Sequence, residues 1–535
     1  MRYQCHPDGY GCVLSPKDTD GDGAIDPICK GQVEDETIFD CADNDKRREP
    51  KERESFDGLD NDCDSIIDEG VIAREYDDER FEADELFENE VKAHRVFYAS
   101  ASPGEADIGF ATADDDVYQA GLAVLSEKAD KSERSVSIRE GGNDQSGYMI
   151  YNFSELATAR ASADRFDLIA AFINTDGCSQ GQLRVGFIKE GYEPKIKMPQ
   201  ESNCHQGIEI DADTSCSNSG GNPGASRVAI ASQHFPNQQT QGLIAWIGDT
   251  VERDNCGDMR NVPVQLLGFW LTDEDIIQVS DNGKPKIVGE TRGGGRPAID
   301  VWSDGVRGYF VGFSDENGSA VVTFVPTLPE LNSRVDPAAI SIGPLFEIEE
   351  GERADQIALA HTPIRDVCPD QEPGIELGVS WQYGCGGVQG GLRFAVLGFA
   401  ANTRTFCLQH PIIEITTGDA SDPRLVPTVV YLKKGFFEPG FERDGLTVTD
   451  INSGGWLVAW VGLHNGTSAI LARRVAELDG ELVDADEVIV LNREISAGEV
   501  RYPFLYNSQT EGRVRYIYHE RLDTERFVGG SLLLY

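Results

Sequence analysis

Apolar strands that end in an aromatic residue recur along this chain, and the recurrence restricts the folds open to it. Each copy joins two such strands through a glycine-containing turn, as in RPAIDVWSDGVRGYFVGFSDENGSAVVTFV from Arg296. The copies are spaced by roughly 60 to 80 residues, and a further copy fits around Tyr98. The recurring aromatic residues are Phe172, Trp246, Phe313, Trp381, Trp460 and Tyr518.

Four short strands per copy, with almost no helical periodicity, predict an all-β fold. We expect residues 93–535 to form a β-propeller of about seven blades, with six or eight as alternatives. One aromatic at an equivalent place in each blade would fill the wedge between neighbouring sheets rather than stack on sugars. The segment from Gly454 to Asn492 also resembles a propeller repeat common in large secreted bacterial proteins.

The C-terminal run FVGGSLLLY ends on a strand with no successor, so the last blade needs a strand from elsewhere. An open edge between the first and last blades would invite aggregation. We therefore expect a strand from residues 90–100 to complete that blade.

Two acidic runs near the N-terminus, DTDGDGAIDP and DGLDNDCDSIIDEG, carry carboxylates on alternate residues. A loop that curls around an ion presents alternate side chains inward, and oxygen-only donors favour calcium over zinc or copper. The alternative is an acidic, solvated segment. The predicted calcium ligands are Asp18, Asp20, Asp22, the carbonyl of Ala24 and Asp26 in the first run, and Asp60, Asp62, Asp64, the carbonyl of Ile66 and Asp68 in the second.

These runs, together with DCADND between them, resemble the acidic metal-binding repeat of secreted bacterial proteins labelled MopE-related. The first run is also similar to thrombospondin type 3 calcium repeats. The resemblance implies a calcium-binding module stabilised by ions and disulfides. Two departures are Phe56, where the repeat usually has a cysteine that pairs with Cys63, and Ser65, where it usually has glycine.

Charge and cysteine content narrow the setting of the protein. A net charge of −45 argues against nucleic acid and anionic membrane surfaces as partners. The 12 cysteines predict disulfides in an oxidising compartment, with buried free thiols as the alternative. Three expected disulfides each bracket a long loop. They are Cys368 with Cys385, Cys178 with Cys204, and Cys216 with Cys256.

No apolar run is long enough to span a membrane, and the start MRYQCHPDGYGC has no signal-peptide character. Export would then require a precursor that begins upstream. The expected organisation is an acidic, cysteine-rich, loop-rich metal-binding module in residues 1–70, a charged linker with a short helix in residues 71–92, and the propeller in residues 93–535.

The predicted function is an exported, calcium-stabilised binding or structural protein of the bacterial cell surface. The propeller would be its interaction platform, and its partner a protein or polysaccharide. The alternative is a carbohydrate-active hydrolase or lyase, which would need two or three carboxylates converging in the propeller channel. No nucleophile elbow, HExxH motif or phosphate-binding loop is present. The basic turn RGGGRP, Arg292 to Pro297, could contact an anion or could simply open a blade.

Overall fold

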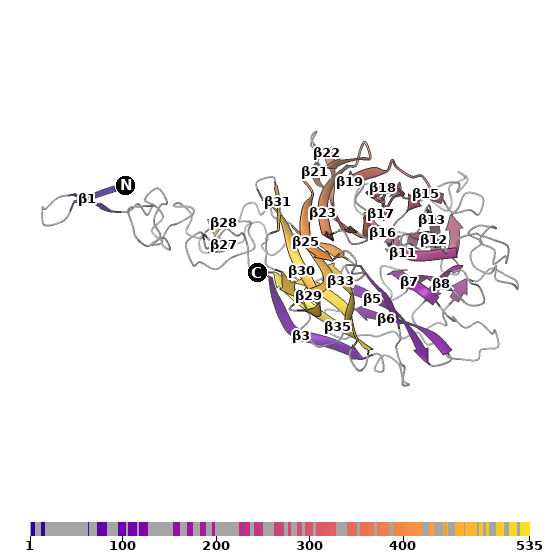
Figure 1. The fold of residues 1–535 in the computed structure, drawn as a ribbon. Helices are drawn as coiled ribbons and strands as arrows, with labels where there is room; N and C mark the ends of the chain where they lie inside the picture. Colours follow the sequence, from indigo (N-terminus) through magenta and orange to yellow (C-terminus); the bar gives the residue numbers. More distant parts are fainter. Residues whose placement is uncertain are drawn as a thin grey trace.

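The computed structural model describes the strands given below and, in parts of residues 157–532, their side chains. Segments that lie outside the described residues include 16–62, 64–71, 83–94, 127–152, 198–223, 250–261, 328–339 and 433–441, and shorter ones separate many of the strands. The described part is built from β-strands and turns, and it contains seven antiparallel sheets arranged as the blades of a propeller (Figure 1). The all-β prediction and the predicted propeller are therefore confirmed.

The blades follow one another in chain order. Blade 1 holds β4 (Arg95–Ser102), β5 (Glu105–Asp114) and β6 (Val117–Ser126). Blade 2 holds β7 (Phe153–Arg160), β8 (Leu168–Asn174), β9 (Gln182–Ile188) and β10 (Lys195–Lys197). Blade 3 holds β11 (Gly224–His234), β12 (Thr240–Asp249), β13 (Val262–Leu271), β14 (Ile276–Val279) and β15 (Lys286–Thr291). Blade 4 holds β16 (Ala298–Trp302), β17 (Gly308–Ser314), β18 (Ala320–Pro326) and β19 (Phe346–Glu349).

The second half of the ring comprises blades 5 to 7. Blade 5 holds β20 (Asp355–His361), β21 (Arg365–Val367), β22 (Glu372–Tyr383), β23 (Gln389–Ala400), β24 (Thr405–Leu408) and β25 (Ile413–Asp419). Blade 6 holds β26 (Thr428–Leu432), β29 (Gly455–His464), β30 (Thr467–Leu478), β31 (Glu481–Asp484) and β32 (Ile489–Val490). Blade 7 holds β33 (Glu499–Asn507), β34 (Arg513–Arg521), β35 (Glu525–Leu534) and β3 (Ile72–Glu82). Two separate hairpins are β1 (Arg2–Cys5) with β2 (Cys12–Ser15), and β27 (Glu442–Arg443) with β28 (Leu446–Thr447).

The first strands of the blades form the inner wall of the ring. Each contacts the first strand of the next blade, from β4 through β7, β11, β16, β20 and β26 to β33. β33 in turn contacts β4, so the ring is closed. Any residue near the axis must therefore come from one of these seven strands or from the loops at their ends.

The last blade is completed by a strand from the N-terminal side, but the segment differs from the expected one. β3 pairs antiparallel with β35, from Ile72 opposite Leu534 to Glu82 opposite Arg526. Figure 1 shows indigo β3 beside yellow β35. The residues expected to close the ring instead contain β4, the inner strand of blade 1. Of the predicted charged linker with a short helix, residues 71–92, the structure describes residues 72–82 and forms this strand there, because backbone pairing with β35 outweighs the helical preference of its glutamates; the rest of the linker lies outside the described residues.

The recurring aromatics lie where the sequence predicts. All six fall on the strand that pairs with the inner strand of their blade, and the five whose side chains are described are buried. Phe313, Trp381, Trp460 and Tyr518 each join a hydrophobic cluster formed by their own blade and the preceding one. They therefore fill the wedges between blades.

Strand β22 illustrates how one sequence serves two wedges. Ile375, Leu377 and Trp381 alternate along it and pack into the cluster shared with blade 4. Gly378 lies on its other face, where a Cβ atom would collide with the indole of Trp456 in blade 6. Because side chains alternate along a strand, β22 turns its large residues toward blade 4 and leaves Gly378 against Trp456 of blade 6.

Candidate functional site

The predicted calcium ligands lie outside the described residues. These are Asp18, Asp20, Asp22, Ala24, Asp26, Asp60, Asp62, Asp64, Ile66 and Asp68. Within residues 18–70 only Cys63 is described: it is disulfide-bonded, and its φ of 64° is left-handed. The calcium site therefore stays a prediction, while at least this cysteine of the acidic segment is oxidised.

The inner wall carries a charged pair that joins blades 4 and 5. Asp300 follows the alternation of β16 that turns Ala298 and Trp302 toward blade 5. His361 continues the alternation of β20 that turns Ile357 and Leu359 toward blade 4. The imidazole Nδ1 lies 2.7 Å from Asp300 Oδ2. The pair thus interrupts an otherwise apolar contact between the two blades, with Ala298 and Trp302 on either side of Asp300 along β16.

The surroundings of Asp300 fix its carboxylate. Its Oδ1 accepts a hydrogen bond from the Val301 amide at 3.0 Å, while Oδ2 faces the imidazole. The side chains of His361 and Asp300 are 27% and 20% exposed, so the pair is partly shielded yet open to solvent. A carboxylate acceptor at Nδ1 orients an imidazole, as in histidines of acid–base sites.

A second polar contact on the inner wall links blades 3 and 4. The Gln233 amide at the end of β11 donates to the carbonyl of Trp302 at 3.0 Å. Gln233 is buried, and its Oε1 has no hydrogen-bond partner among the described residues. The ends of β11, β16 and β20 are thus tied to one another by polar side chains at one end of the ring.

The opposite corner of the wedge between blades 4 and 5 has its own clamp. Arg393 of β23 forms an ion pair with Glu349 of β19. The guanidinium carbon of Arg393 also lies 4.2 Å from the ring centroid of Tyr383, within cation–π range. This wedge is therefore held by charge at two corners and by aromatic packing between them.

Sequence reasoning missed the Asp300–His361 pair. No sequence motif spans the two positions. The available signal was positional: each residue lies on the first strand of its blade, and consecutive first strands are neighbours. Within the part of the chain that the structure describes, no group of three or more histidine, cysteine, aspartate or glutamate side chains gathers as a metal site.

The basic turn RGGGRP is described from Gly295 onward. A Cβ atom at Gly295 would collide with the Asp355 carboxylate and the Gln356 amide at the start of blade 5. The glycine is therefore required by the close approach of two blade entries, which favours the interpretation of this turn as the opening of a blade.

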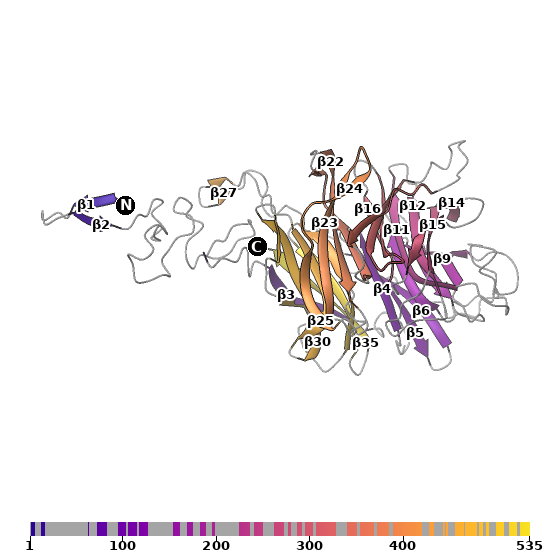
Figure 2. The same ribbon diagram turned by 45° about the horizontal axis from the view of Figure 1, so that its top comes forward.

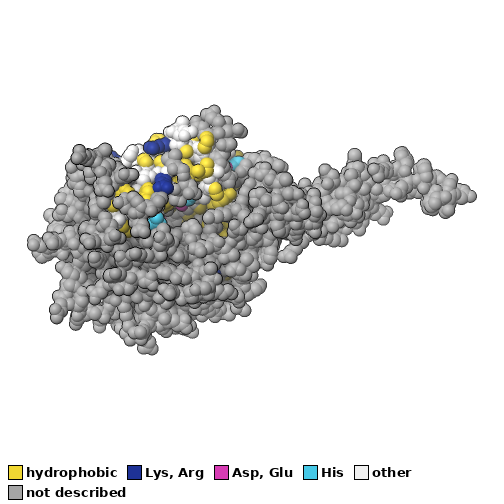
Figure 3. All heavy atoms as spheres, turned by 180° about the vertical axis from the view of Figure 1, so that it is seen from behind, with side chains coloured by type: hydrophobic (Ala, Val, Ile, Leu, Met, Phe, Trp, Pro, Cys, Tyr) yellow, Lys and Arg dark blue, Asp and Glu magenta, His cyan; other side chains and the backbone are white. Residues whose placement is uncertain are grey.

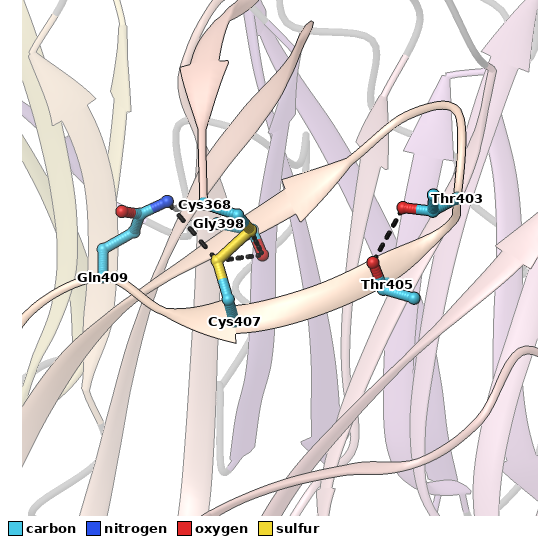
Figure 4. The surroundings of a disulfide bond; sticks show 6 residues. All are labelled: Cys368, Gly398, Thr403, Thr405, Cys407 and Gln409. Atoms are coloured by element: carbon cyan, nitrogen blue, oxygen red, sulfur yellow. Dashed lines mark hydrogen bonds between the residues drawn. A yellow bond between two sulfur atoms is a disulfide. The ribbon is translucent and has the colours of Figure 1, made fainter. Parts of the chain in front are cut away.

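Blade 5 carries a projection fixed by a disulfide. β21 pairs with the first residues of β22, and β24 pairs with the last residues of β23, so the blade extends beyond its inner strand (Figure 2). Cys368 bonds to Cys407 across these strands, whereas pairing with Cys385 was expected; that prediction is wrong. Both sulfur atoms lie 3.6 Å from the carbonyl oxygen of Gly398, beneath the bridge (Figure 4).

Gly398 explains the unexpected pairing. A Cβ atom there would collide with Gln409 and crowd both sulfurs, so only glycine lets the bridge cross the face of β23. The projection also exposes large apolar side chains: Ile364 is 51% exposed and Leu408 is 43% exposed. Seen from behind, the described surface mixes hydrophobic, basic and histidine side chains, with little acid visible among them (Figure 3).

No family model matches the chain, and no curated protein matches it in sequence. Solved structures that it resembles include the α-L-arabinofuranosidase of Fusarium graminearum in complex with arabinobiose, at 11% identity, covering 71% of this chain and 92% of that chain with a TM-score of 0.35. Another is the Aleuria aurantia lectin in complex with Fucα1-6GlcNAc, at 10% identity, 71% and 94% coverage and a TM-score of 0.35.

A third similar structure is the β-propeller domain of the Pyrococcus furiosus trilobed protease, at 10% identity, 83% and 96% coverage and a TM-score of 0.32. At these scores the likeness carries no argument about function, and the fold rests on the sheets and contacts described above. No helix in the described part has the length and apolarity to span a membrane.

Proposed function

We propose that this chain is an exported binding protein that presents its propeller as an interaction platform and is stabilised by calcium in residues 18–70. The observation that carries the platform is the blade 5 projection, where Ile364 and Leu408 are exposed on a segment fixed by the Cys368–Cys407 disulfide. A rigid surface loses little conformational entropy on binding, and apolar side chains held in water gain most from being covered.

Export is supported by the same disulfide together with oxidised Cys63, since disulfides persist in oxidising compartments. Calcium is supported by the donor set of the two acidic runs, which offers carboxylate and carbonyl oxygens in the alternating pattern that calcium loops use. The partner is a protein or polysaccharide at the cell surface.

The platform is tested by binding of the purified, oxidised chain to surface protein and polysaccharide fractions in calcium. We expect the double substitution Ile364→Ser and Leu408→Ser to weaken binding at least tenfold. The matched control replaces Ile287 and Leu345, which are 59% and 45% exposed on blades 3 and 4, with serine. Equal losses in both variants would show that the projection has no special role.

A carbohydrate-active enzyme is the second candidate, and the Asp300–His361 pair beside the axis is the observation in its favour. Its test is release of reducing ends from a panel of neutral and acidic polysaccharides. An activity abolished by Asp300→Asn, with folding intact, would replace the binding proposal by this one.

A further inference from the structure

The outer edge of blade 5 is formed by two short strands in line. β24 pairs with the last residues of β23, and β25 pairs with its first residues. β24 ends the sheet order β20–β22–β23–β24, so no described strand pairs with its far side. The backbone amides and carbonyls on that side need partners, as they do at every strand edge.

The hydrogen-bond register shows which residues of β24 face outward. The ladder with β23 extends to Gln409, whose backbone N–H donates to the carbonyl of Val396 at 3.0 Å. In an antiparallel pair, residues that bond to the neighbouring strand alternate with residues whose amide and carbonyl point away from it. Two residues before Gln409, Cys407 therefore also bonds toward β23. Phe406 and Leu408 direct their N–H and C=O groups to the open edge, where no described backbone group pairs with them.

Two features together distinguish β24 from the other outer strands. Charged residues commonly protect sheet edges from pairing with other chains, and β10, β15, β19, β25 and β31 each contain at least one. β24 has the uncharged sequence TFCL. It is also fixed on both faces: Cys407 is bonded to Cys368 on one face (Figure 4), and on the other the Phe406 ring lies 4.8 Å from that of Phe399. β14, with the sequence IIQV, is uncharged too but contains no cysteine to fix it.

Two side chains beside this edge add selectivity. Leu408 is 43% exposed and lies on the same face of β24 as Phe406, two residues away. Arg404 is exposed in the turn that precedes the strand. The edge therefore combines open backbone hydrogen-bonding groups with an apolar contact and a positive charge.

We infer that β24 is the docking edge of the platform, where an extended peptide segment of a partner protein adds to blade 5 as a further strand and places a carboxylate near Arg404. The inference rests on the proposed function and names the class of partner. The open backbone groups of Phe406 and Leu408 repeat every second residue, and the backbone of another extended chain repeats in the same way. A polysaccharide has no such series of amides, so the edge favours a protein. Because β24 is already fixed, it loses little conformational entropy when the partner strand adds.

The probe is an array of synthetic ten-residue peptides that alternate valine or isoleucine with a varied residue and carry aspartate or glutamate near one end. Binding of the full, oxidised chain in calcium selects one peptide, and fluorescence polarisation measures its dissociation constant. Two further versions of this peptide carry N-methyl groups on alternate amides, in opposite phases. Only every second amide of an added strand faces β24, so one version should lose binding and the other should keep it.

Leu408→Pro tests the edge from the side of the protein. Proline removes the outward N–H of this residue and leaves the ladder with β23 intact, as edge strands allow. The matched control is Leu408→Ala, which loses the side chain and keeps the N–H. We expect the proline variant to bind the peptide about tenfold more weakly than the alanine variant, because a carbonyl of the peptide is left unpaired. Arg404→Gln should reduce the preference for acidic peptides about threefold.

The outcomes separate the docking edge from the function on which it rests. Equal binding by Leu408→Pro and Leu408→Ala would overturn the docking edge, and so would an array without a binder. The N-methylated peptides are measured on the unchanged protein, so the test stands even if the proline variant does not fold. Binding that survives both phases of methylation would also overturn the inference. If surface fractions still bind through Ile364 and Leu408 in any of these cases, the platform stands and its partner is held by side chains alone.

Discussion

Replacing Tyr309 with phenylalanine should stabilise the protein, although the change removes a polar group from a well-packed core. Tyr309 is fully buried between blades 3 and 4, and its hydroxyl has no hydrogen-bond partner among the described residues. Burying an unpaired hydroxyl costs about 1 to 3 kcal/mol in proteins. Phenylalanine keeps the ring and its packing, so we expect a gain of about 1 kcal/mol.

Tyr516 is the matched control. It is equally buried, between blades 6 and 7, but its hydroxyl donates to the carbonyl of Leu491 at 3.2 Å. Tyr516→Phe should therefore cost about 1 kcal/mol, the usual net worth of a buried hydrogen bond. The free energies of unfolding of the two variants should therefore change in opposite directions and differ from each other by about 2 kcal/mol. Urea unfolding followed by tryptophan fluorescence measures both. Equal losses in both would refute the reasoning, because they would mean that the Tyr309 hydroxyl is hydrogen-bonded.

Alkaline pH gives a second readout of the same residue. Burial raises the pKa of the Tyr309 hydroxyl well above its ordinary value. The unfolded chain then loses this proton first, at a pH of about 10, so stability declines as pH rises above that point. Tyr309→Phe should make the decline shallower than in the wild type, and an unchanged slope would contradict the pKa assignment.

Three further perturbations follow, two from described contacts and one from the predicted calcium site. Gly398→Ala should hinder formation of the Cys368–Cys407 disulfide, which titration of free thiols detects. Loss of that disulfide should lower the free energy of unfolding by about 4 kcal/mol, given the 39-residue separation of its cysteines. An alanine variant with a fully formed disulfide would refute the steric argument. His361→Asn should cost about 1 kcal/mol by removing the partner of a partly exposed carboxylate, whereas His464→Asn, at the β29–β30 turn, should be neutral. Replacing Asp20 and Asp22 with asparagine should weaken the first calcium site and spare the second, measured by calorimetry; equal loss at both sites would argue against two separate loops.

Local sequence patterns predict most of the fold, but they do not predict the Asp300–His361 pair. Alternation and turn residues predict the strands, and regular spacing predicts that Trp381 and Trp460 occupy equivalent wedges. The contact between Asp300 and His361 depends on two first strands lying side by side, which no local pattern encodes. The disulfide from Cys368 crosses β23 at Gly398, which leaves room for it. The sequence around the loop therefore indicated Cys385, whereas the partner is Cys407. The acidic sequence of β3 did not predict a strand, because the strand depends on pairing with β35 at the other end of the sequence.

That last pairing sets the order in which the protein can fold. During synthesis β3 is the first propeller strand to be made, and its partner β35 is the last. Earlier blades can form as they emerge, but the pairing of β3 with β35 must wait until β35 has been made, because this contact has the longest sequence separation among the described strands. A chain released early would lack β35 altogether and leave β3 unpaired. Synthesis through β35 is thus a condition for a complete blade 7, and products that stop before it would be distinguishable by an unpaired β3 that is open to proteases.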